Sequence, residues 1–209
     1  ILGGFISTDA LALVFNRTGL TAIAIAVYML LKKRPFRAEA KHLWFMALCG
    51  VLIAAHWITF FGAIKIANVS ITLAGISTGA LFSALLSPIL GKARIDWIEL
   101  LLGSLVVVGI VIIFYEEPNS ADTRKTALLG ISFTNYQIGL LIALLSASLS
   151  ASFSILNKTL VARFPYPVAV TFWEIGLAFI AIFIYDLAFG THNPINLLVS
   201  STSDIIYIA

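Results

Sequence analysis

The sequence predicts an all-α integral membrane protein, a multi-helix bundle with inverted-topology repeats. The first observation is composition: 60% of the 209 residues are hydrophobic, 11% are charged, and the mean hydropathy is +1.03. The second is that hydrophobic residues form segments long enough to cross a bilayer of roughly 30 Å as helices. The third is a short pattern that recurs in the first and last segments. This composition excludes a disordered chain, a nucleic-acid-binding tail protein and an ordinary water-soluble enzyme.

Six segments are predicted to span the membrane, at residues 9–31, 43–65, 69–90, 97–115, 137–157 and 167–189. They are much longer than the strands of a membrane barrel, which favours helices. Residues 1–6 resemble the end of an earlier span, and residues 204–209 resemble the start of a later one.

Basic residues between the segments predict the orientation of the chain. They concentrate after the first, third and fifth segments, at Lys32, Lys33, Arg34, Arg37, Lys41, Lys92, Arg94, Lys158 and Arg163. Loops rich in lysine and arginine stay in the cytoplasm, so the polar stretch 116–136 is external. We therefore expect a multi-pass protein of the bacterial inner membrane, with a first repeat over 1–115, an external linker over 116–136 and a second repeat over 137–209.

The segment 9–31 contains Arg17 about two turns from its outer end. A charge within a span is costly and therefore needs an explanation. Arg17 either reaches outward to the membrane surface, binds a carboxylate substrate, or joins two helices through their carbonyl groups.

The segment 43–65 places His56, Thr59, Phe60 and Ala63 on one helical face, with Trp57 beside them. A polar tip among aromatic rings suits a pocket for an amphiphilic small molecule, although a histidine bonded between helices has the same pattern. Cys49 lies in an apolar run and is expected to act as a small hydrophobic residue. Metal-ligand spacing is not found around His56, so neither a metal nor another cofactor is predicted.

The segment 69–90 has small residues at every fourth position, namely Gly75, Gly79, Ser83 and Ser87, which favours close helix packing. Ser77 and Thr78 could still present hydroxyl groups to a cavity, and Pro88 could kink or end the helix. Residues 75–79 also match the G-x-S-x-G pattern of serine hydrolases, with His56 on the neighbouring segment. That motif needs a strand-to-helix turn, so an intramembrane hydrolase is the less favoured alternative, and no enzyme is predicted.

The segment 97–115 is apolar almost throughout. The segment 137–157 has an alanine stripe suited to packing and a second stripe that includes Ser146 and Ser150, which could line a cavity. Asn157 could cap this helix or line its inner mouth.

The segment 167–189 contains Glu174, expected to face the bundle interior, as a proton-titrating or amine-binding carboxylate or as a protonated structural group. Residues 172–177 repeat the F-x-charge-x-G-L pattern of residues 15–20, and the two segments run in opposite directions. Inverted repeats are typical of transporters that work by alternating access. A passive channel and a non-transporting membrane scaffold remain as alternatives.

Four stretches of the chain resemble the EamA family of the drug/metabolite transporter superfamily. They are Phe15–Arg17 followed by Lys32–Arg34, residues 50–70, the passage from Leu85–Pro88 into Trp97, Glu99 and Gly103, and residues 148–158. The resemblance covers nearly the whole chain, but Ser87 stands before Pro88 where the family commonly has a glutamate.

The resemblance implies a protein of ten helices in two inverted five-helix repeats. It also implies export of amino acids, other small metabolites or drugs, in many members with a proton gradient. The expected partners are a small-molecule substrate, the lipid bilayer and protons, with no nucleic acid, and the oligomeric state is left open. The cavity-lining candidates that it implies are His56, Trp57, Phe60, Ser77, Thr78, Ser146, Ser150 and Asn157.

Overall fold

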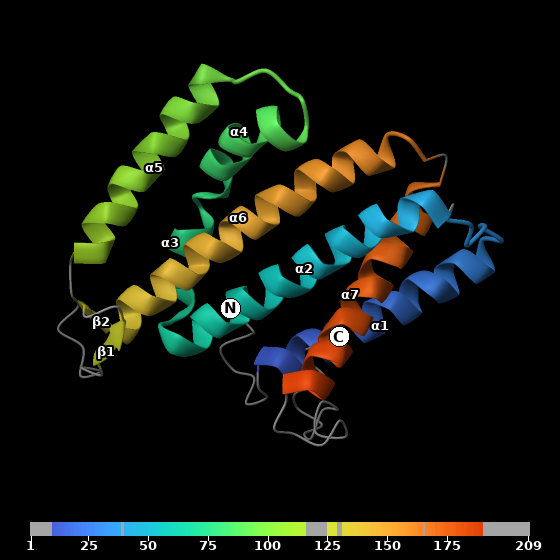
Figure 1. The fold of residues 1–209 in the computed structure, drawn as a ribbon, viewed down its shortest axis with the longest axis horizontal. Coiled ribbons are helices and arrows are strands. Elements are labelled where there is room, and N and C mark those ends of the chain that lie inside the picture. The colour runs from blue at the N-terminus through green and yellow to red at the C-terminus, as the bar shows by residue number, and fades with distance from the viewer. Residues whose placement is uncertain (1–9, 39, 116–124, 129–130, 165, 190–209) are drawn as a thin grey trace. The chain divides into compact units, whose positions relative to one another are not determined.

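The computed structural model describes residues 10–38, 40–115, 125–128, 131–164 and 166–189 (Figure 1). The predicted spans at residues 1–6 and 204–209 lie outside these ranges. The described helices are α1 (Ala10–Leu31), α2 (Ala40–Ile66), α3 (Val69–Ile76), α4 (Gly79–Leu90), α5 (Trp97–Tyr115), α6 (Asn135–Val161) and α7 (Pro167–Phe189).

The prediction of an all-α membrane protein is confirmed. Among the described residues, five stretches are long and apolar enough to cross a membrane: Leu11–Leu31, Lys41–Ile66, Val69–Leu90, Asn135–Val161 and Pro167–Ala188. The apolar part of α5, Trp97–Ile112, is shorter, although the whole helix of 19 residues would extend about 28 Å.

Local hydrogen bonds explain where several helices begin. The Asn68 side chain accepts a hydrogen bond from the Ile71 amide at 2.9 Å, which caps α3. Asp96 accepts one from the Ile98 amide at 2.9 Å before α5. Thr134 and Gln137 exchange reciprocal side-chain-to-backbone bonds at the start of α6, which is a capping box.

Two features differ from the predicted elements. The segment 69–90 is not one helix, because α3 and α4 are separated at Ser77 and Thr78 (Figure 1). The linker 116–136 contains a short antiparallel hairpin, in which β1 (Lys125–Leu128) pairs with β2 (Ile131–Thr134) in the register Lys125↔Thr134.

The chain forms two compact units. The first contains residues 59–155, and the second contains residues 4–58 and 156–209, so α2 and α6 contribute residues to both. Each unit contains residues from before and after the linker 116–136, so the packing units do not coincide with the predicted repeats. The repeat boundaries stay a prediction.

In the first unit, α6 lies beside the stretch of chain that runs from the end of α2 to the end of α4, and both run in the same direction. The space around glycine residues shows how closely the backbones approach. A Cβ on Gly139 would clash with that of Ala67, and one on Gly75 would lie 2.5 Å from that of Ala143. A Cβ on Gly91 would lie 2.9 Å from Ile155. These contacts show that small residues allow close helix packing here. Within the predicted stripe this holds for Gly75, whereas a Cβ on Gly79 would meet no described atom within 4 Å.

In the second unit, α1 packs against α7. The Phe15 and Phe179 rings stack with centroids 4.4 Å apart, and a Cβ on Gly19 would lie 2.9 Å from the Phe179 ring. A buried cluster of Met46, Leu160 and Val170 joins α2, α6 and α7 in the same unit. The two helices that carry the repeated F-x-charge-x-G-L pattern are thus direct neighbours.

Candidate functional site

Glu174 is buried in the second unit, with 2% of its surface exposed, where α7 contacts α2. The Cys49 thiol on α2 donates a hydrogen bond to its carboxylate. Among the described residues, its Oε1 atom has no hydrogen-bond partner. A buried carboxyl group with an unused oxygen can exchange a proton or bind a cationic group.

Gly50 explains how α2 comes so close to this carboxyl group. A Cβ at Gly50 would lie 2.7 Å from the Glu174 carbonyl oxygen and 2.9 Å from the Ala178 nitrogen. Because these are backbone atoms, they cannot move aside as the end of a side chain can. Only glycine therefore allows the observed contact between α2 and α7.

Arg17 lies half-buried on α1, with its Cζ atom 5.1 Å from the centre of the Trp57 ring. A cation over an indole face is an attractive arrangement. The Trp57 ring also meets the His56 ring edge-to-face, with centroids 5.6 Å apart. The second unit therefore brings together Arg17, Trp57 and His56 from α1 and α2.

Ser77 and Thr78 lie in the first unit, at the interruption between α3 and α4. The Ser77 hydroxyl donates to the Ala74 carbonyl and the Thr78 hydroxyl to the Gly75 carbonyl, both at 2.6 Å. Thr78 is 1% exposed, whereas Ser77 is exposed. The G-x-S-x-G pattern begins inside helix α3, at Gly75, so Ser77 is not at a strand-to-helix turn.

The α6 candidates differ in burial. Ser146 is fully buried and Ser150 is half-buried, both in the first unit. Phe60 also belongs to this unit, and its ring meets Phe61 edge-to-face. Asn157 belongs to the second unit, and its buried Oδ1 atom finds no partner within the described ranges.

Sequence reasoning missed Asp186. This residue of α7 is 3% exposed, and its Oδ1 atom has no hydrogen-bond partner among the residues that the structure covers. It lies twelve residues beyond Glu174, about 18 Å along the helix axis. The sequence does contain a sign of this residue, because an acidic side chain inside an apolar segment is unusual. The contact of Cys49 with Glu174 was missed as well, because it depends on the rotation of two helices.

The described residues hold no group of three His, Cys, Asp or Glu side chains suited to a metal ion. The functional candidates are instead isolated charged and hydroxyl-bearing side chains within apolar helices. Such an arrangement suits the handling of small molecules or protons inside a membrane.

Comparison with known proteins agrees with this geometry. No curated protein and no solved structure matches the chain. The sequence profile of the EamA-like transporter family matches residues 4–115, which is more than half of the chain. The matched region includes α1 to α5 and therefore Arg17, Cys49, His56 and the interruption at Ser77 and Thr78. The chain is a multi-pass membrane protein and belongs to the EamA-like transporter family.

Proposed function

We propose that the protein is a secondary active transporter that exports amino acids or related small metabolites by alternating access. The family supports transport of a small molecule across a membrane. The observation that carries the proposal further is the interruption of the span 69–90 at Ser77 and Thr78. In many transporters, the substrate binds near the middle of the bilayer at helices that are interrupted there.

The position of the interruption supports this role. Ser77 lies eight residues beyond Val69, which is about 12 Å along a helix, in a hydrocarbon layer of about 30 Å. The Thr78 amide donates to the Gly75 carbonyl at 3.2 Å, and helical bonding resumes when the Phe82 amide donates to Thr78. The change in hydrogen bonding between α3 and α4 therefore lies near the middle of the span.

Hydroxyl groups gather at the same level of the first unit. Thr78 and Ser146 each lie three residues beyond the contact of Gly75 with Ala143, on parallel helices, and both are buried. A Cβ at Gly79 would meet no atom of the described residues within 4 Å, so there is room beside the interruption. Ser77, Thr78, Ser146 and Ser150 are our candidates for the polar part of the substrate, with Phe60 for its apolar part.

The remaining candidates belong to the second unit. His56, Trp57 and Asn157 are assigned to substrate binding by family resemblance. Glu174 is our candidate for coupling transport to protons, and the Cys49 thiol is the titratable group that contacts it from α2. Arg17 is assigned a structural role, because it already faces the Trp57 ring.

Counterflow in proteoliposomes tests the assignment of Thr78. Replacement Thr78→Val keeps the shape of the side chain and removes its hydroxyl group, whereas Thr78→Ser keeps the hydroxyl. We expect saturable amino-acid counterflow to fall at least about tenfold in T78V, the loss of one buried hydrogen bond to the substrate, and to persist in T78S.

Ser104→Ala on α5 is the matched control, because the exposed Ser104 hydroxyl also donates to a backbone carbonyl, that of Leu100. Equal counterflow in T78V, S104A and the unmodified protein would remove Thr78 from the site. Labelling of Ser77 by a fluorophosphonate would instead point to a hydrolase.

A further inference from the structure

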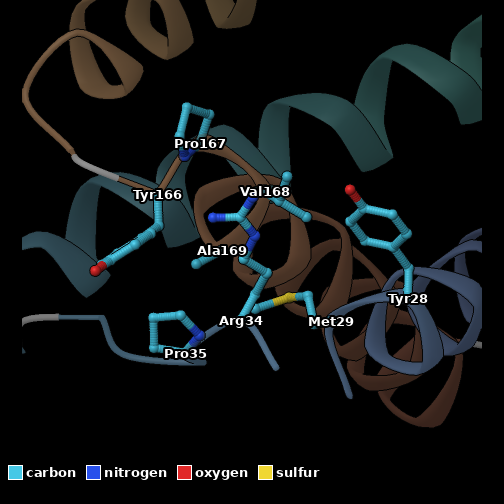
Figure 2. A pocket seen from close by; sticks show the side chains of 8 residues that line it. All are labelled: Tyr28, Met29, Arg34, Pro35, Tyr166, Pro167, Val168 and Ala169. Atoms are coloured by element: carbon cyan, nitrogen blue, oxygen red, sulfur yellow. The ribbon is translucent and has the colours of Figure 1, made fainter. Parts of the chain in front are cut away.

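A groove runs along the surface of the second unit between α1 and α7. At one end of the groove, beside Arg34, there is a cavity of about 150 Å³ (Figure 2). A second depression of about 390 Å³ continues from it along α1. The two have Tyr28 and Val168 in common, so they adjoin each other, and we refer to them together as the groove.

The cavity lies where two membrane-spanning helices begin or end. Helix α1 ends at Leu31, and α7 begins at Pro167, which lines the cavity together with Tyr166. Arg34 belongs to the most basic loop of the chain, which also contains Lys32, Lys33, Arg37 and Lys41. By the charge rule this is the cytoplasmic side, where the leaflet carries anionic lipids.

The backbone holds Arg34 in place at the end of α1. Lys33 has a φ of 49°, and the Arg34 amide donates to the Met29 carbonyl at 2.8 Å. The Lys33 amide donates to the Leu30 carbonyl at 3.1 Å, which completes a Schellman motif. Figure 2 shows the Arg34 side chain extending toward the first residues of α7.

The cavity has the chemistry of a phosphate site. Arg34 offers a guanidinium group, which matches the geometry of phosphate oxygens. The rings of Tyr28 and Tyr166 belong to the lining on either side of it (Figure 2). None of the described residues that line the cavity is acidic. An anion here would therefore meet donors and no opposing charge.

The continuation along α1 is apolar for most of its length. Its lining includes Leu20, Ala24, Ile25 and Val168, together with Thr21. Its far end is bounded by Arg17, whose guanidinium faces Trp57. From Tyr28 to Leu20 the groove follows about 12 Å of helix. A hydrocarbon chain parallel to the helices fits this shape and polarity.

We propose that this groove binds an anionic phospholipid of the cytoplasmic leaflet. Arg34 binds its phosphate, and one acyl chain lies along Ala24 and Val168. Such a lipid would bridge α1 and α7. None of the residues that line the groove is among our candidates for substrate binding, so the two proposed sites are distinct.

Native mass spectrometry of the full-length protein in an uncharged detergent tests this proposal. Phosphatidylglycerol and phosphatidylcholine are added in turn, so that no charged bilayer surface contributes. We expect phosphatidylglycerol, whose headgroup has a net negative charge, to bind at least about tenfold more tightly than phosphatidylcholine, whose own ammonium group offsets its phosphate. Arg34→Gln is expected to abolish that preference. Arg37→Gln, in the same loop but outside the lining residues, is expected to retain it.

A second pair of variants tests the apolar part. Ala24→Phe fills the groove and is expected to weaken the binding of both lipids, whereas Ile23→Phe, on an exposed position outside the lining, is not. Equal effects of R34Q and R37Q would overturn the proposal. Binding of water-soluble glycerol 3-phosphate as tight as that of phosphatidylglycerol would also overturn it, because the ligand would then be a free phosphate.

Discussion

Among the described charged residues, Glu174 has the surroundings that most clearly indicate a function. It is buried, one of its oxygens lacks a partner within the described chain, and its neighbour Cys49 is only a weak hydrogen-bond donor. Burying a carboxyl group in an apolar helix costs free energy, so such a group is by default a functional candidate.

The substitution Glu174→Gln tests the coupling role. Glutamine has the same shape but cannot exchange a proton. We expect counterflow to change between an acidic and an alkaline pH in the unmodified protein, and to lose this dependence in E174Q. Glu99→Gln, at an exposed acidic residue in the first turn of α5, should keep the dependence. An unchanged pH dependence in E174Q would clear Glu174 of coupling.

The sequence predicted Glu174 and Arg17 as candidates, but it did not predict Asp186 or the surroundings of any of the three. Glu174 and Arg17 stand out because a charge is rare in an apolar span. Which neighbour each one meets depends on how the helices rotate about their axes. These helices are apolar on nearly every side, so no polar face marks the rotation, and the contact of Arg17 with Trp57 could not be foreseen.

At the scale of elements, the contact of α2 with α7 depends on a single glycine. We expect Gly50→Ala to destabilise the protein by about 1–3 kcal/mol, the usual cost of overpacking a close contact. Thermal unfolding in detergent measures this. Gly62→Ala is the matched control in the same helix, because a Cβ there would meet no described atom within 4 Å. A similar melting temperature for G50A and G62A would contradict the close approach.

The interruption between α3 and α4 gives a second prediction at this scale. Gly79→Leu would fill the open space beside Thr78 without a clash at its Cβ position. We expect this variant to insert and fold normally and to lose most of its counterflow. Gly62→Leu provides the comparison, and equal counterflow in both variants would argue against a ligand beside the interruption.

Helix positions were predictable because the length of an apolar run reports directly on a membrane span. The segments 9–31, 97–115 and 167–189 agree with α1, α5 and α7 within one residue at either end. Helix α6 extends beyond its apolar run because the capping box at Thr134 starts it early. The interruption at Ser77 had no clear signal, since Gly75 and Gly79 also suit helix packing, as Gly75 does against Ala143.

For the whole molecule, the membrane explains why small residues form the interfaces. Lipid is as apolar as leucine, so burying large side chains contributes little to holding helices together. Large residues such as Leu101, Leu105 and Val108 of α5 are accordingly exposed on the protein surface, where lipid can cover them. The fold class followed from composition for this reason, whereas the substrate depends on a few side chains that composition does not describe.

The orientation of the chain can be tested with its single cysteine removed. In a Cys49→Ala background, we expect Thr126→Cys in the hairpin to react with an impermeant maleimide added outside cells. Lys92→Cys, in a predicted cytoplasmic loop, should react only after the membrane is opened. The reverse pattern would overturn the orientation inferred from the basic loops.

The central claim is that this chain carries small metabolites across a membrane. The most direct measurement is counterflow by the full-length protein in proteoliposomes preloaded with pooled amino acids, nucleosides or sugars. We predict saturable uptake of label with the amino-acid pool. Uptake that does not saturate would indicate a channel, and no exchange with any pool, from protein shown to be folded and inserted, would contradict metabolite transport.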